Sequence, residues 1–304
     1  MSFSYDLKLE LYKKRPRALH CRIAELAGIL AFSSKMKEDN SGRYMQVKID
    51  HGELEDKLVW LFQSLFQYEV IFTLPEDNSE TVKAKIYEND FITRIFQTCK
   101  LKEEDGRLTA GESVIQSQCC KRAFLRGAFQ ANGSITSPEK SYQIEVACQS
   151  LEKAEQLLRI LQKEEISGKM IERKGRWVVY LKGADKISYF LGVIGASNSM
   201  MEFENVRILK DIRNSVNREV NCDTANIRKM TDAAVKISED IHLIFEKLGP
   251  DSLSPQLREI AYARLEYPDV SLKELGMHLD PPLGKSGVNH RLRKLSDIAE
   301  SLKN

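Results

Sequence analysis

The sequence predicts an α+β protein in which two similar units of helices and antiparallel strands form a pseudo-dimer, followed by an all-α C-terminal domain. The first observation is a repeat: the apolar pattern around Gly28 returns around Gly127, 99 residues later. The second is that residues 251–304 contain helical patterns and turn signals but no strand pattern. With 304 residues, 42% of them hydrophobic and 30% charged, the chain is long enough for two domains and has a globular composition.

Each unit begins with a helix rich in small residues. The segments AELAGILAFSS (24–34) and AFLRGAFQANG (123–133) share this character, and both end in polar residues. Each has a glycine at the matching position, Gly28 in one and Gly127 in the other. Because glycine has no side chain, these positions predict that the two repeat helices approach each other closely.

The same order of elements then follows both helices. Alternating polar and apolar residues predict strands, and apolar residues spaced three and four apart predict helices with one buried face. The turn Lys174-Gly175 joins the last two strands. The predicted strands are 43–50, 69–74, 82–87, 141–148, 169–173 and 177–182, and the predicted helices are 53–67, 90–99, 151–163 and 184–192.

A long helical region connects the duplicated part to the C-terminal part. Helical patterns cover 202–220 and 225–247, and Asn221-Cys222-Asp223 between them predicts a break. Gly249-Pro250 is a strong stop signal. The predicted domains are therefore a duplicated domain at 1–221, a connecting helix at 222–250 and a C-terminal domain at 251–304.

Three helices are predicted in the C-terminal domain. The first covers 255–266, the second runs from a Ser271 cap to Leu279, and the third runs from a Ser286 cap to about Leu302. Two prolines separate the second helix from the third, because proline lacks an amide donor and clashes with the preceding turn. Short helices in this order, with a basic third helix, are typical of a helix-turn-helix that binds duplex DNA.

The third helix carries the candidate DNA contacts. Its N-terminal half contains a basic block without acidic residues. Asparagine suits adenine and arginine suits guanine, lysine binds phosphate, and Gly287 would let a phosphate approach the helix amides. The predicted contacts are Lys285, Ser286, Gly287, Asn289, His290, Arg291, Arg293 and Lys294. A basic helix is a loose signal by itself, so a three-helix module that only packs against another domain stays open.

Other classes of protein and site are not indicated. The net charge of +2 does not by itself predict a nucleic-acid partner. No apolar stretch is long enough to span a membrane and the start lacks a signal-peptide core, so we expect no membrane partner and a cytoplasmic, nucleoid-associated protein. The six cysteines form no CxxC pair, and adjacent Cys119 and Cys120 lack the spacing of zinc ligands. The prediction is free thiols, no metal and no cofactor.

Three stretches resemble the WhiA family of bacterial sporulation and cell-division transcription regulators. They are CCKRAFLRGAFQANGS, ENVRILKDIRNSVNREVNCDTANI and LDPPLGKSGVNHRLRKLSDIAE, and the similarity covers nearly the whole chain. The resemblance implies a domain similar to LAGLIDADG homing endonucleases followed by a C-terminal helix-turn-helix. It also implies a regulator of sporulation or cell-division genes that binds double-stranded DNA at promoters, and it leaves open another transcription regulator as a second partner.

The resemblance also provides a test for enzymatic activity. In LAGLIDADG nucleases each repeat helix ends in an acidic residue, and the pair holds the divalent metal that activates water. Ser33 and Asn132 occupy these two positions here, and neither supplies the carboxylate that a hard cation prefers. We therefore expect no catalytic residue and no enzyme. A metal-dependent DNA endonuclease is the disfavoured alternative, and a nucleoid-associated interaction scaffold is the other.

Basic residues on the predicted sheets leave the role of the duplicated domain open. Such residues would line a saddle for the DNA backbone, or they would form the solvated face of an antiparallel sheet or part of a docking platform. The residues concerned are Lys48, Lys83, Lys85, Arg173, Lys174 and Arg176.

Overall fold

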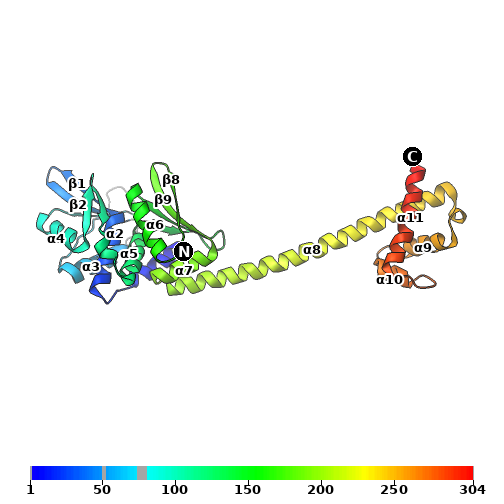
Figure 1. Cartoon of the computed structure of the whole chain (residues 1–304), viewed down its shortest axis with the longest axis horizontal. Coiled ribbons are helices and arrows are strands. Elements are labelled where there is room, and N and C mark those ends of the chain that lie inside the picture. Colours follow the sequence, from blue (N-terminus) through cyan, green and yellow to red (C-terminus); the bar gives the residue numbers. More distant parts are fainter. Residues whose placement is uncertain (1, 50–52, 74–80, 304) are drawn as a thin grey trace. The chain divides into compact units, whose positions relative to one another are not determined.

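The computed structural model describes residues 2–49, 53–73 and 81–303, which divide into two compact units at Asp211 (Figure 1). The first unit contains the duplication. Its elements are α1 (Phe3–Lys13), α2 (Leu19–Ser33), β1 (Ser34–Asp39), β2 (Gly42–Ile49), α3 (Glu53–Phe66), β3 (Val82–Ile86), α4 (Asn89–Cys99), β4 (Leu101–Glu104), β5 (Arg107–Ala110), the 3-10 turn η1 (Glu112–Ile115), α5 (Gln118–Asn132), β6 (Gly133–Ile135), β7 (Gln143–Cys148), α6 (Leu151–Lys163), β8 (Lys169–Arg173), β9 (Arg176–Lys182), α7 (Ala184–Ile194) and the start of α8 (Ser197–Leu248).

Two antiparallel sheets follow the repeat. The strand orders are β3-β2-β1-β5-β4 in the first sheet and β6-β7-β9-β8 in the second. Val47 in β2 pairs with β1 and β3 on its two sides, and Val146, 99 residues later in β7, pairs with β6 and β9 in the same way. Lys174 and Gly175 both have positive φ, as the predicted tight turn requires. The predicted α+β pseudo-dimer is confirmed.

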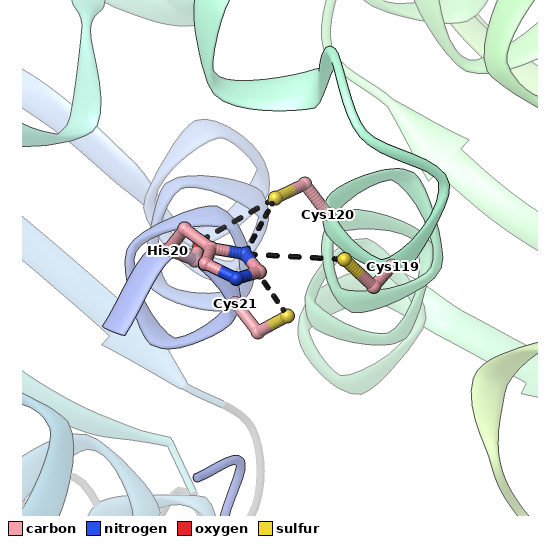
Figure 2. A group of neighbouring side chains, drawn as sticks. All are labelled: His20, Cys21, Cys119 and Cys120. Carbon is pink, nitrogen blue, oxygen red and sulfur yellow. Dashed lines mark hydrogen bonds between the residues drawn. The ribbon is translucent and has the colours of Figure 1, made fainter. Parts of the chain in front are cut away.

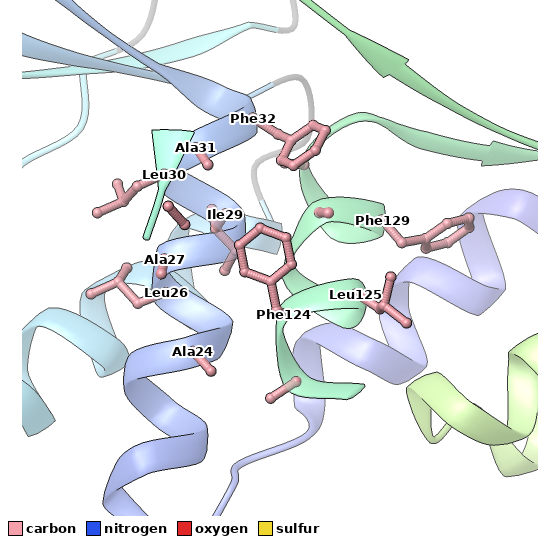
Figure 3. Packing of buried hydrophobic residues seen from close by; sticks show 14 of the residues in the cluster. Ala24, Leu26, Ala27, Ile29, Leu30, Ala31, Phe32, Phe124, Leu125 and Phe129 are labelled. Atoms are coloured by element: carbon pink, nitrogen blue, oxygen red, sulfur yellow. The ribbon is translucent and has the colours of Figure 1, made fainter. Parts of the chain in front are cut away.

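The two units of the repeat meet through helices α2 and α5, which lie side by side at the centre of the core. A Cβ atom on Gly28 would lie 2.5 Å from the carbonyl oxygen of Phe124, and one on Gly127 would lie 2.2 Å from that of Glu25. Because neither glycine has a side chain, the backbone of α2 packs directly against the backbone of α5. Figure 3 shows Phe124 beside α2, where its ring centre lies 6.3 Å from that of Phe32.

A buried ion cluster lies beside this contact. The carboxylate of Glu25 lies 2.9 Å from the ammonium of Lys57 in α3 and 2.9 Å from the guanidinium of Arg126 in α5. Arg126 also donates to the carbonyl oxygen of Ile194, at the end of α7. Burial lowers the pKa of Lys57 to about 8, and the negative charge of Glu25 opposes this shift. The cluster thus links four helices of the first unit.

The first unit differs from the prediction in a missing strand and in several elements that were not predicted. Residues 69–73 form no strand beyond a single bridge between Thr73 and Lys83, and Leu74 lies outside the described residues. Helix α1 and the strands β1 and β6 were not predicted. The hairpin of β4 and β5 was not predicted either, although Asp105-Gly106 between these strands is a hairpin signal. This hairpin extends the first sheet next to β1.

The predicted break at Asn221-Cys222-Asp223 is wrong, because α8 is one continuous helix of 52 residues. Asparagine, cysteine and aspartate are only modestly unfavourable in a helix, and neither glycine nor proline stands there to end it. The helix stops before Gly249, whose φ of 79° is left-handed. The second unit continues with the 3-10 turn η2 (Pro250–Ser252), α9 (Pro255–Glu266), α10 (Leu272–Met277) and α11 (Lys285–Lys303).

We predict that Gly127→Ala destabilises the first unit strongly. The added methyl group would meet the carbonyl oxygen of Glu25, which is backbone and cannot rotate away. Separating two packed helices to make room costs about 3 kcal/mol. Chemical denaturation followed by circular dichroism measures the free energy of unfolding.

Gly192→Ala is the matched control. Gly192 lies in helix α7, and its Cβ would make only an ordinary contact of 3.4 Å with the Met200 sulfur. Because alanine favours the helix over glycine, this change should leave stability unchanged or raise it by up to about 1 kcal/mol. Equal destabilisation by the two substitutions would contradict the close-approach argument.

Candidate nucleic-acid interface

Helices α9, α10 and α11 form a small apolar core together with the end of α8. Ile241 and Ile244 of α8 are fully buried against residues such as Ile260, Leu275 and Leu295. The predicted first helix, 255–266, is confirmed as α9. The last two turns of α8 therefore belong to the same core as the three short helices.

The short helix α10 is fixed at its start by a capping box. The Ser271 side chain accepts from the amide of Glu274 at 3.3 Å, and the Glu274 carboxylate accepts from the amide of Ser271 at 2.9 Å. The predicted cap is confirmed, although the helix ends at Met277, before the predicted Leu279. The hydrogen bonds from Ser271 hold the pKa of the Glu274 carboxyl below its usual value.

The turn between α10 and α11 depends on glycine. The amide of Leu283 donates to the carbonyl oxygen of Gly276 at 2.8 Å, and a Cβ on Gly276 would lie 1.9 Å from the Leu283 carbonyl oxygen. A Cβ on Gly287 would lie 2.0 Å from the side chain of Leu283. Gly287 therefore has a packing role within the domain, in addition to the phosphate contact that the sequence predicts.

A buried arginine organises the other turn, between α9 and α10. Arg264 is 3% exposed, and its guanidinium donates to the carbonyl oxygens of Tyr267, Pro268 and Val270 at 3.1–3.5 Å. These bonds satisfy backbone acceptors that no secondary structure satisfies, so one side chain fixes the path of the turn.

Most of the predicted DNA contacts lie on the surface of α11. The exposed ones are Lys285, Ser286, Asn289, His290, Arg293 and Lys294. Ser286 does not cap the helix as predicted, because α11 begins one residue earlier, at Lys285. Arg291 is less accessible: its side chain is 17% exposed and lies 3.4 Å from the Glu259 carboxylate of α9.

The first unit carries a second basic surface, a cavity of about 400 Å³ at the C-terminal ends of α2 and α5. Its lining includes Ser33 and Asn132, the two positions that the resemblance aligns with the nuclease acids. Among the described residues, no carboxylate lines it and five cationic residues do: Lys35, Lys37, Lys48, Arg107 and Arg176. Sequence reasoning found Lys48 and Arg176 but missed the others, although Lys35 and Lys37 flank Met36, which is almost buried, in the alternation of a strand.

Neutral groups and one buried ammonium hold the ends of the two repeat helices. The Asn132 amide donates to the carbonyl oxygens of Phe32 at 2.9 Å and Ala147 at 3.2 Å. The Ser33 hydroxyl donates to its own helix. Lys153 is fully buried and donates to the carbonyl oxygen of Ala31 at 2.5 Å, and burial lowers its pKa to about 8. A fixed cation here opposes a divalent metal ion.

The other predicted sheet cations have different surroundings. Lys85 lies 3.1 Å from Asp39, and Arg173 lies 3.5 Å from Glu145. Lys83 is half-buried in β3, and Lys174 is in the β8–β9 turn. Among the described residues, the grouping of metal-ligand type lies elsewhere, at the N-terminal ends of α2 and α5.

A pseudo-dimer of helix-and-sheet units that meet through two glycine-containing helices, followed by a helix-turn-helix, defines a LAGLIDADG-like protein with a helix-turn-helix domain. Comparison with known proteins agrees. Residues 121–213 match the family described as WhiA LAGLIDADG-like domain, and residues 216–299 match the WhiA C-terminal HTH domain. Within the described residues, no helix has the length and apolar character to cross a membrane.

Similar proteins cover the full chain. It is 40% identical to the probable cell division protein WhiA of Lachnoclostridium phytofermentans over 100% of both chains. It is 42% identical to the protein of the same name from Lachnospira eligens, over 100% of this chain and 98% of the other. The fold matches full-length WhiA from Thermotoga maritima with a TM-score of 0.60, 24% identity and 99% coverage of each chain. The chain belongs to the WhiA family.

We predict that Ser271→Ala lowers the stability of the helix-turn-helix by about 1 kcal/mol, because the amide of Glu274 loses its acceptor. Thermal unfolding of the second unit, followed by hydrogen exchange at amides of α10, measures the loss. Ser254→Ala is the matched control, since Ser254 is also an N-cap but its side chain makes no capping bond. A loss of the same size at Ser254 would contradict the role assigned to the capping box.

Proposed function

We propose that this protein is a sequence-specific, DNA-binding transcription regulator that does not cleave DNA. The observation that carries the proposal is the exposed face of α11, where short polar and cationic side chains stand on a helix held rigidly by its own core. A helix-turn-helix presents the N-terminal part of its last helix to the major groove. The relatives are named as probable cell division proteins, which favours cell-division genes as targets. Sporulation genes are an expectation that rests on the family resemblance alone.

The spacing of the exposed residues supports base reading. Ser286, Asn289 and Arg293 follow one another at intervals of three and four, so they lie along one face of α11. His290 and Lys294 extend this face on one side. Asparagine discriminates adenine and arginine discriminates guanine, whereas lysine contacts phosphate. Arg291, held by Glu259, is assigned to positioning α11 rather than to the DNA.

The basic cavity supports a second, non-catalytic contact with DNA. The described part of the lining has five cations and no carboxylate, which attracts phosphate and repels divalent metal ions. The first unit would then hold the backbone of the duplex, and binding promoter DNA would place the protein at the nucleoid. Another transcription regulator as a second partner stays a prediction, as does an interaction scaffold in which neither surface touches DNA.

We predict that Arg293→Ala with Lys294→Ala weakens binding to promoter fragments and lowers the salt dependence of the affinity. Each lost phosphate contact reduces the slope of log affinity against log salt by about 0.9. Asn289→Ala should instead reduce the preference for the specific site over random DNA by about 5- to 150-fold, the equivalent of one base contact. Fluorescence anisotropy at several salt concentrations measures both quantities.

Arg228→Ala is the control for charge, because Arg228 is an exposed arginine of α8 whose side chain is 82% exposed. Its binding curve should match that of the unaltered chain. Lys37→Ala with Arg107→Ala tests the cavity and should weaken binding to specific and random DNA alike. If the α11 variants bound with unchanged affinity and preference, α11 would not be the reading helix, and the scaffold alternative would replace the proposal.

We predict that the purified protein does not nick supercoiled plasmid in the presence of Mg²⁺ or Mn²⁺, because Ser33 and Asn132 supply no carboxylate to hold the metal ion. Gel electrophoresis of the plasmid after incubation provides the measurement. A contaminating nuclease would be indifferent to Asn132→Ala. Cleavage that survives purification and disappears in this variant would establish the endonuclease alternative.

A further inference from the structure

Two pairs of metal-ligand residues stand at equivalent places in the repeat. His20 and Cys21 are the second and third residues of α2, and Cys119 and Cys120 are the second and third residues of α5. The offset between the pairs is the same 99 residues that separates the two interface glycines. Because α2 and α5 lie side by side, the pseudo-symmetry brings the two pairs together.

The four ligand atoms form a compact group (Figure 2). The Nδ1 atom of His20 and the three Sγ atoms all lie within 4.8 Å of one another. His20 Nδ1 lies 3.1 Å from the sulfur of Cys120, 3.4 Å from that of Cys21 and 3.9 Å from that of Cys119. In a tetrahedral zinc site with bonds of about 2.0–2.3 Å, neighbouring ligand atoms are about 3.5–3.8 Å apart. The three distances bracket this range.

The donor set selects the kind of ion. Three thiolates and one imidazole are soft and borderline ligands, which suit Zn²⁺ and exclude Mg²⁺ or Ca²⁺. Four protein ligands fill a tetrahedron and leave no position for water, as in structural rather than catalytic zinc sites. The expectation of no metal rested on spacing along the chain, whereas here the ligands come from two segments that meet only in the fold.

The surroundings suit the charge of such a site. Zinc with three thiolates carries one net negative charge, and the ligands lie in the first turns of two helices, where the free amides favour negative charge. Because zinc binds the thiolate form of cysteine, binding releases the thiol protons to solvent.

We propose that His20, Cys21, Cys119 and Cys120 form a structural zinc site that clips the two halves of the duplicated domain together. The site lies about 18 Å from the basic cavity, measured as the rise of α2 from Cys21 to Ser33. At this distance the ion would stabilise the fold and would not contact groups bound in the basic cavity. His20 and Cys119 are exposed, so an ion can enter from solvent.

The test uses the full chain, freed of metal by a chelator and kept reduced without oxygen. Titration with Co²⁺ should give the visible bands of tetrahedral cobalt–thiolate coordination, saturating at one ion per chain, and Zn²⁺ should displace the cobalt and remove the bands. Zinc at about 100 times its Kd should also raise the unfolding midpoint of the first unit by about 5–10 °C.

Cys119→Ser should lose the cobalt bands and the thermal shift, and because Cys119 is exposed the metal-free variant should unfold at the same temperature as the metal-free unaltered chain. Cys222→Ser is the matched control, since Cys222 is an exposed cysteine of α8, and it should keep both responses. A chain that gives no tetrahedral bands, or bands that survive Cys119→Ser, would overturn the site. The site would also be overturned if the chain, isolated under reducing conditions, contained a disulfide between Cys21 and a cysteine of α5 and bound no cobalt.

Discussion

The close approach of α2 and α5 is the constraint on which the first unit depends. With no side chain at Gly28 or Gly127, the two helices meet backbone to backbone, and this leaves little freedom in their relative position. The buried carboxylate of Glu25 then reaches a lysine from one neighbouring helix and an arginine from the other half. Moving the helices apart would leave a buried charge in this cluster without its partner, which is strongly destabilising. The glycine contact and the ion cluster therefore both stabilise the same arrangement of α2 and α5.

The same contact determines what lies at each end of the helix pair. At the C-terminal ends it brings together Ser33 and Asn132, with the buried ammonium of Lys153 nearby. The described groups around these ends are neutral or cationic, so the electrostatic field of the cavity favours an anion over a metal ion. At the N-terminal ends it brings a histidine and three cysteines into one group.

Features that depend on the spacing of apolar residues, on helix caps and on glycines were predictable from the sequence. The repeat offset, the interface glycines, the Ser271 cap and helix α9 follow from patterns within a few residues. The continuity of α8 was not, because three residues of mild helix preference weigh little against the residues on either side. The contact of Arg291 with Glu259 was not predictable either, since the two residues are 32 apart in the chain and become neighbours only after folding. The cysteine–histidine group has the same origin, because pseudo-symmetry rather than spacing assembles it.

Arg264 has a consequence for how this domain can vary. Its guanidinium binds three carbonyl oxygens in the turn after α9, and every amino acid supplies a carbonyl oxygen. The residues of that turn can therefore be exchanged without loss of the bonds that shape it. All three bonds are donated by one nitrogen of this side chain, Nη1, so a short or apolar side chain at position 264 would leave the three carbonyl oxygens without this donor. The shape of this turn therefore depends on one buried helical residue and not on the identity of the residues in the turn. Substitutions in the turn can then accumulate while its backbone path is kept.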